Sequence, residues 1–186
     1  MVLSLHNRNP HHQRSRSTGL SLTELLSTFS AKLTGSTPEQ IHSVIENGLS
    51  ELLNLTSSGC VCWYGGDPRN EDLKLLLYST DTQALELLPP VLTRTELPYV
   101  FEVLSNGRSV IFRSPKDLPS EATRDREFFR ERSIWNLMMT SSQCDAHSTG
   151  VLAVAFLPED IQPTDNLVAQ LTLFSNLVGN AVKWQR

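Results

Sequence analysis

The sequence predicts an α+β domain in which helices cover both faces of a mostly antiparallel sheet of five to six strands. Segments with helical spacing of apolar residues alternate along the chain with short apolar runs typical of strands. In a chain of 186 residues, a hydrophobic content of 39% supplies the core of one domain. We expect that domain to occupy residues 21–186, after a flexible polar and basic tail over residues 1–20.

Two amphipathic helices are expected at the start of the domain. Ser21 and Glu24 have the spacing of a capping box, and Gly35 is a typical helix end. Thr37 is a helix N-cap followed directly by Pro38, which favours the first turn of a second helix. Apolar residues at helical spacing predict that both helices bury one side.

Strands and shorter helices follow these two helices. A strand closed by the turn signal Gly65–Gly66–Asp67–Pro68 and a second strand form a predicted hairpin. Ser120 is the expected cap of a highly charged helix. The expected elements are a β-rich run over 57–67 that ends in the turn signal, strands over 73–80, 108–112, 133–142 and 150–157, helices over 96–107, 120–132 and 164–186, and a polar loop over 143–149.

The closing helix carries a row of apolar residues separated alternately by four and three positions. This spacing is typical of a coiled-coil seam, so we expect the helix to pair with a second copy of the chain. The expected partner is therefore the chain itself, as a homodimer. The residues of this seam are Leu167, Leu171, Phe174, Val178 and Ala181.

The order of elements and several short motifs resemble the GAF domain family over about residues 22–184. The resemblance rests on Leu97–Pro98, Gly107–Arg108–Ser109–Val110, Asp117–Leu118–Pro119–Ser120–Glu121–Ala122, Arg126–Glu127–Phe128 and Gly150–Val151–Leu152–Ala153. GAF domains are sensory domains, as in bacterial sensor histidine kinases and formate-hydrogenlyase-activator-type transcription regulators. The resemblance implies a GAF-like (PAS/profilin-like) fold with the N- and C-terminal helices packed together.

The resemblance also implies a ligand pocket between the sheet and the charged helix. Each aromatic residue expected there is a candidate ligand contact, with plain core packing as the alternative. Arg126 would select a carboxylate or phosphate if it entered the pocket, and otherwise lies on a solvated helix surface. The expected pocket residues are Trp63, Tyr78, Phe101, Phe112, Arg126, Phe129, Trp135 and Leu137.

Cysteine chemistry offers alternatives to a simple binding domain. Cys60 and Cys62 share one face of a strand, which suits core packing better than a dithiol or metal site. Cys144 and His147 form one isolated C-x-x-H, short of the four ligands of a zinc site. We predict no metal, no cofactor and no catalytic residue, although an unknown small-molecule ligand fits the family.

Charge and hydropathy exclude other classes. The net charge of −4, with +3 in the tail, leaves −7 on residues 21–186, which disfavours direct contact with nucleic acid. No apolar run is long enough to span a membrane, and the cysteine usage is typical of a cytoplasmic protein. We expect part of a longer bacterial regulator, with a kinase or transcription-activator output domain on the same chain or a partner.

The expected function is therefore a non-enzymatic, small-molecule-binding sensory domain that dimerises through its terminal helices. Two alternatives stay open. The first is a dimerisation module whose pocket is filled by its own side chains. The second is an enzyme similar to the GAF-fold reductases of free methionine sulfoxide, with Cys60, Cys62 and Cys144 as the thiols.

Overall fold

The computed structural model describes residues 21–70, 72–81, 88–144, 147–156 and 164–183. The expected tail over residues 1–20 lies outside them. The elements are α1 (Leu22–Gly35), α2 (Pro38–Leu55), β1 (Ser58–Gly65), β2 (Leu73–Thr80), β3 (Val91–Leu92), α3 (Pro98–Ser105), β4 (Val110–Phe112), the 3₁₀ helix η1 (Pro115–Asp117), α4 (Thr123–Glu131), β5 (Asn136–Cys144), β6 (His147–Phe156) and α5 (Asp165–Lys183).

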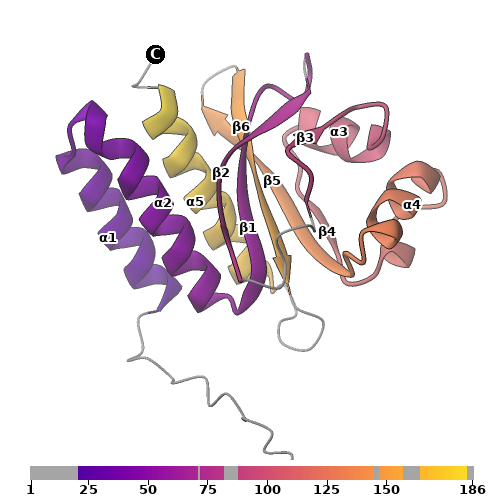
Figure 1. The fold of residues 1–186 in the computed structure, drawn as a ribbon, viewed down its shortest axis with the longest axis horizontal. Helices are drawn as coiled ribbons and strands as arrows, with labels where there is room; N and C mark the ends of the chain where they lie inside the picture. The colour runs from indigo at the N-terminus through magenta and orange to yellow at the C-terminus, as the bar shows by residue number, and fades with distance from the viewer. Residues whose placement is uncertain (1–20, 71, 82–87, 145–146, 157–163, 184–186) are drawn as a thin grey trace, which may run out of the picture.

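The six strands form one antiparallel sheet in the order β3-β2-β1-β6-β5-β4. The two longest pairings hold β6 between β1 and β5, so the chain's last strand lies in the middle of the sheet. Figure 1 shows α1, α2 and α5 on one side of this sheet and α3 and α4 on the other. The predicted α+β class, with helices on both faces, is confirmed.

The first apolar layer, here called the helix-side layer, lies between the sheet and α1, α2 and α5. The ring of Phe29 stacks on that of Phe174, with ring centres 4.6 Å apart, and so joins α1 to α5. Gln170 Nε2 also donates to Thr23 Oγ1 at 2.9 Å. The terminal helices therefore pack together, as predicted. The layer includes Leu25, Leu33, Ile41, Ile45, Leu49, Leu52, Val61, Trp63, Met138, Leu152 and Val154.

The residues of the predicted seam of α5 are part of this layer. Leu171, Phe174 and Val178 are fully buried and Ala181 is 1% exposed, while the partly buried Leu167 packs against the same cluster from its edge. These side chains contact the chain's own helices and sheet. The half-exposed apolar residue of α5 is Leu173.

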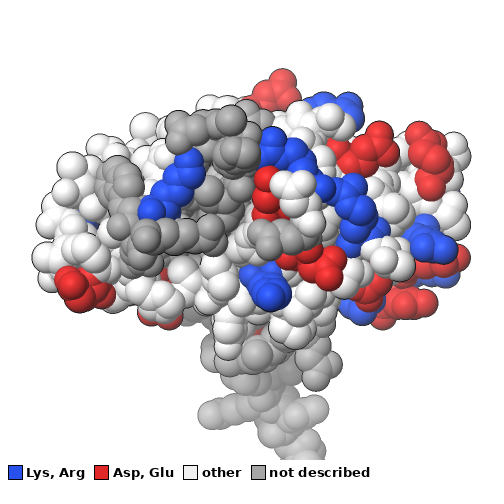
Figure 2. All heavy atoms as spheres, turned by 90° about the horizontal axis from the view of Figure 1, so that it is seen from above, with Lys and Arg blue, Asp and Glu red and all other residues white. Residues whose placement is uncertain are grey.

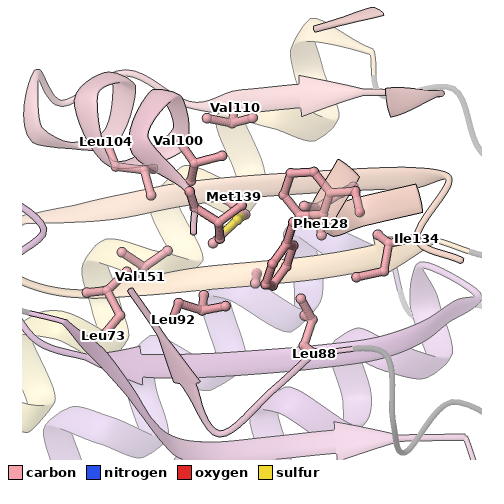
Figure 3. Packing of buried hydrophobic residues seen from close by; sticks show 14 of the residues in the cluster. Leu73, Leu88, Leu92, Val100, Leu104, Val110, Phe128, Ile134, Met139 and Val151 are labelled. Carbon is pink, nitrogen blue, oxygen red and sulfur yellow. The ribbon is translucent and has the colours of Figure 1, made fainter. Parts of the chain in front are cut away.

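The second apolar layer, here called the lid-side layer, lies between the sheet and α3, α4 and η1. Figure 3 shows Phe128 and Ile134 converging with Leu88, Leu92 and Met139 above the strands. The layer contains Cys60, Cys62, Tyr64, Leu73, Leu88, Leu92, Leu97, Val100, Phe101, Val103, Leu104, Val110, Phe112, Leu118, Ala122, Phe128, Phe129, Ile134, Leu137, Met139, Val151, Ala153 and Ala155.

Element boundaries agree with the predictions at the first helices and differ at the charged helix. The Ser21–Glu24 capping box is present, with Oγ of Ser21 accepting from the Glu24 amide at 3.2 Å. α4 begins at Thr123 rather than directly after Ser120, whose carbonyl instead accepts from Thr123 Oγ1. The expected 143–149 loop is shorter, because β5 extends to Cys144 and β6 begins at His147.

Gly150 of β6 lies close to Trp63 of the neighbouring strand β1. A Cβ atom on Gly150 would lie 2.5 Å from the Trp63 ring and 2.5 Å from the Tyr64 carbonyl oxygen. Only glycine fits there, because real Cβ atoms do not approach other atoms so closely. The Trp63 indole is fully buried, and its N–H finds no hydrogen-bond partner in the described part of the chain.

The helices of the described segments differ in length or hydropathy from a membrane span. None of the helices there combines the length and the apolar character needed to cross a bilayer.

Candidate functional site

Four of the eight expected pocket residues come together in the lid-side layer. Phe101 of α3, Phe112 of β4, Phe129 of α4 and Leu137 of β5 are all at most 2% exposed. The rings of Phe112 and Phe129 tilt against one another with centres 4.8 Å apart. The structure thus brings these residues into one cluster, packed side chain against side chain.

The other aromatic candidates do not join that cluster. Trp63 points into the helix-side layer, since strand side chains alternate and its neighbours Cys62 and Tyr64 face the lid. Trp135 precedes β5 rather than lying on it and is 44% exposed. Tyr78 pairs with Cys62 on β1 and so shares its face, but Tyr78 is 53% exposed at the margin of the layer.

Arg126 lies on α4 and bonds within its own segment. Its guanidinium donates to the carbonyl of Ser120 at 2.7 Å and approaches Thr123 Oγ1 at 3.5 Å. These contacts tie the first turn of α4 to the segment before it. The bonded guanidinium therefore holds the local turn and does not enter the lid-side layer.

The outer surface of the lid side is charged, as expected for a solvated helix. Figure 2 shows lysine, arginine, aspartate and glutamate side chains interspersed over the part of the molecule that carries α3 and α4. Arg124, Glu127, Arg130 and Glu131 of α4 are all exposed. The mixture of both signs makes a solvated cover rather than a surface for one kind of charged partner.

The floor of the lid-side layer has small side chains at its centre. Cys60 pairs with Ala155 and Cys62 with Ala153 across β1 and β6, so four small residues lie side by side on the face toward the lid. Tyr64 follows on the same face, and its hydroxyl donates to the carbonyl of Pro89 at 2.8 Å. Burial raises the pKa of Tyr64, so the phenol stays neutral.

The two thiols on this floor are in direct contact. The Sγ atoms of Cys60 and Cys62 lie 3.1 Å apart, and the side chains are 4% and 2% exposed. Their hydrogen bond lowers the pKa of Cys60 and, together with burial, raises that of Cys62. Cys60 is therefore the more acidic thiol of the pair.

Asp125 is a buried carboxylate that sequence reasoning missed. It lies on α4, is 0% exposed, and accepts from the amide of Val100 at 2.9 Å and that of Tyr99 at 3.3 Å. These amides belong to the first turn of α3, which has no capping side chain of its own. Asp125 thus fastens α3 to α4, while burial, the largest influence, raises its pKa.

Polar residues of β5 connect the two faces of the sheet. On the lid side, Ser141 Oγ donates to the carbonyl of Leu104 in α3 at 3.3 Å. On the helix side, Ser175 Oγ of α5 donates to the carbonyl of Thr140 at 3.4 Å. The hydroxyls of Thr140 and Thr172 lie 3.4 Å apart. All these side chains except Thr172 are at most 3% exposed.

A signal for this connection was present in the sequence. Residues 140–142 read Thr-Ser-Ser directly after the apolar run Leu-Met-Met, and buried hydroxyls in a strand need partners. Thr140 also accepts from Ser109 Oγ at 3.0 Å, beside β4. Two adjacent residues of one strand therefore hold α3, α5 and the start of β4.

Metal ligands are sparse in the part of the chain with described side chains. No group of three or more His, Cys, Asp or Glu residues there could hold a metal ion. The side chains of the expected pair, Cys144 and His147, are not among those that the structure describes.

Comparison with known proteins places this arrangement among GAF folds. No family model and no curated protein matches the sequence. The phycocyanobilin-bound GAF domain of a cyanobacterial phytochrome superposes with a TM-score of 0.72 at 14% identity, covering 90% of this chain and 96% of that one. The GAF domain of an Acinetobacter phosphoenolpyruvate-protein phosphotransferase gives 0.62 at 12% identity, over 87% and 92%.

An enzyme shares the same fold. The free methionine-R-sulfoxide reductase of Neisseria meningitidis, solved with its substrate, gives a TM-score of 0.65 at 12% identity, over 89% of this chain and 90% of that one. The fold is therefore common to ligand-binding sensory domains and to a reductase. The sheet order, the helices on both faces and these superpositions together show that this chain folds as a GAF domain.

Proposed function

We propose that this chain is a non-enzymatic sensory domain, which binds a small molecule in the lid-side layer and transmits binding to α5. The observation that supports it most is the pair of adjacent residues on β5. Ser141 bonds α3 on the lid side, and Thr140 bonds α5 on the opposite side. A molecule that displaces α3 or α4 would move Ser141 and, through one peptide bond, Thr140.

The physical requirement for such a sensor is a difference in affinity between two arrangements of α5. A ligand shifts the equilibrium only by as much as it prefers one arrangement. Hydroxyl contacts suit this role, because hydrogen bonds of 3.3–3.4 Å are weak. The cyanobacterial phytochrome and the Acinetobacter phosphotransferase, which carry the same fold, support a ligand-binding or regulatory role by analogy.

A second candidate function has its own support. Phe101, Phe129 and Leu137 are each 0% exposed, so the chain's own side chains pack the lid-side layer where the described residues line it. A regulatory module that binds no ligand would look like this. The two candidates differ in whether the layer opens to a small molecule.

Dimerisation and output remain proposals. We propose that two copies associate through the outward side of α5, where Leu173 is half exposed, in place of the buried seam. A kinase or transcription activator, on this chain or a partner, would take the signal from α5. We also propose a cytoplasmic location for this protein, because such outputs act there.

The ligand proposal is tested by mass spectrometry of the freshly purified protein under native and denaturing conditions. A small extra mass that disappears on denaturation is the expected result, and its value identifies the ligand class. A clean ligand-free protein, together with no thermal shift across a metabolite collection, would favour the self-filled module.

The transmission step is tested by hydrogen exchange with Ser141→Ala. This variant removes the bond to α3 and leaves every described contact of α5 in place. We expect amides of residues 170–180 to exchange about fivefold faster, which corresponds to ~1 kcal/mol of lost coupling. Ser142→Ala is the matched control, since its hydroxyl bonds the carbonyl of Gly150 within the sheet. Equal exchange in α5 for both variants and the wild type would contradict the proposal.

A further inference from the structure

The thiol pair of Cys60 and Cys62 has a geometry that core packing does not require. The Sγ atoms lie 3.1 Å apart, with both side chains turned toward each other from the same face of β1. Residues two apart on a strand have Cα atoms roughly 6.6–6.8 Å apart, at the upper limit for a disulfide. A direct sulfur–sulfur bond would therefore bend the strand, whereas a bridge through one additional atom would not.

The distance also selects the kind of bridging atom. With bonds of about 2.3 Å, the usual length for zinc and sulfur, two sulfurs 3.1 Å apart subtend about 85° at the bridging atom. A tetrahedral ion requires a wider angle and two more ligands, and a linear ion requires sulfurs on opposite sides. A near-right angle with two sulfur ligands suits a trivalent pyramidal centre such as arsenic(III) or antimony(III).

We propose that Cys60 and Cys62 form a dithiol site for trivalent arsenicals and antimonials. In the binding step an arsenoxide, R–As=O, condenses with both thiols. Two As–S bonds form, the As=O bond breaks, and the oxygen leaves as water with the two thiol protons. The oxidation states do not change, so no oxidant or reductant is needed.

The surroundings of the pair favour this chemistry. The first nucleophile is Cys60, because the hydrogen bond from Cys62 lowers its pKa and supplies more thiolate. Ala153 and Ala155 are the cross-strand partners of the thiols on β6, so small side chains lie beside the pair under the apolar lid. Trivalent arsenicals and antimonials are thus a specific ligand class for the lid-side layer. This inference rests on the proposed function, because it requires that the layer admit a small molecule.

The margin of the sheet nearest the thiol pair lies along β2. Tyr78 and Thr80 are the partners of Cys62 and Cys60 on that strand, and Tyr78 is 53% exposed. β3 covers only the other end of β2, pairing with Leu73 and Lys74. Among the described strands, none continues the sheet beyond Tyr78 and Thr80, so this margin is where an arsenical would enter.

The test is addition of phenylarsine oxide to the reduced, folded protein, followed by intact-mass spectrometry. We expect one arsenical per chain with loss of one water, removed by 2,3-dimercaptopropanol and retained in an excess of a monothiol. Cys60→Ser and Cys62→Ser should each lose the adduct that resists the monothiol. Cys144→Ser is the matched control and should keep it.

A second measurement does not depend on the variants folding. The wild-type protein is treated with phenylarsine oxide, denatured, alkylated with iodoacetamide and mapped by peptide mass. Both Cys60 and Cys62 should be protected and Cys144 alkylated. An adduct that forms only in urea, or that survives either single serine substitution, would overturn the site. Native small-molecule binding that persists in the Cys60→Ser/Cys62→Ser protein would still support the sensory function.

Discussion

Replacing Asp125 by alanine is expected to loosen α3 from α4 and destabilise the whole lid side. The Asp125 carboxylate accepts from two amides in the first turn of α3, which has no cap of its own. Alanine leaves the Val100 amide buried without its acceptor. A buried donor without a partner is destabilising, because the unfolded state still bonds it to water.

The size of the effect follows from the two distances. A hydrogen bond to a charged group contributes roughly 1.5–3 kcal/mol, and loss of a helix cap costs about 1 kcal/mol. Val100 is bonded at 2.9 Å and Tyr99 more weakly at 3.3 Å. We therefore expect Asp125→Ala to lower the free energy of unfolding by about 3 kcal/mol. With a urea m-value of about 2 kcal/mol/M, the unfolding midpoint falls by about 1.5 M.

The pH dependence provides a sharper check on the state of the carboxylate. Burial raises the pKa of Asp125 above its ordinary value of 3.8, so the folded protein holds this proton to a higher pH than the unfolded chain. Stability from the protonated carboxyl is present below pH 3.8 and is lost as pH rises through the raised pKa. Asp125→Asn lacks this titration.

Urea titrations of the wild type and Asp125→Asn at several acidic pH values measure the difference. We expect the stability of the wild type relative to Asp125→Asn to decrease as pH rises. Asp117→Asn serves as the control, because Asp117 caps η1 from an exposed position. An advantage of the wild type that instead grows with pH would show that the amide bonds outweigh burial, and would refute the argument.

Three further changes test how α5 and α2 pack. Leu171→Asp should unfold the protein, because Leu171 is fully buried, whereas Leu173→Asp should leave the unfolding free energy within about 0.5 kcal/mol. Size-exclusion chromatography with light scattering should show Leu173→Asp as a monomer if the wild type is dimeric, and a dimeric variant would exclude that side of α5. Gly48→Ala should destabilise by about 1–3 kcal/mol although alanine favours helices, because its Cβ would lie 2.5 Å from the Phe29 ring; a gain in melting temperature would contradict this.

Periodicity predicted most of the fold, because each long helix buries one side and each central strand is a short apolar run. The helices over Leu22–Gly35 and Pro38–Leu55 and the paired strands appear where apolar spacing placed them. β3 was missed since two residues, Val91 and Leu92, are too few to show a period. The start of α4 was missed because Ser120 is a good cap by type, yet the helix begins three residues later.

The candidate site was harder to predict, for two physical reasons. Alternation puts Trp63 opposite Cys62, but only the pairing of the whole sheet decides which side faces the lid. The seam of α5 has the same spacing whether its partner is another copy or the chain's own core. Asp125 was hidden among the charges of α4, since its acceptor role depends on amides 25 and 26 residues away in α3.

The contact of Gly150 with Trp63 has an evolutionary consequence. A side chain at position 150 would meet both the Trp63 ring and the carbonyl of Tyr64. A smaller residue at 63 would relieve the first clash and leave the second, which is backbone. Substitution of Trp63 is therefore compatible with Gly150. Substitution of Gly150 is not tolerated, whether or not Trp63 has changed first, because the clash with the Tyr64 carbonyl oxygen remains. Divergence of this fold should erase the tryptophan long before it erases the glycine.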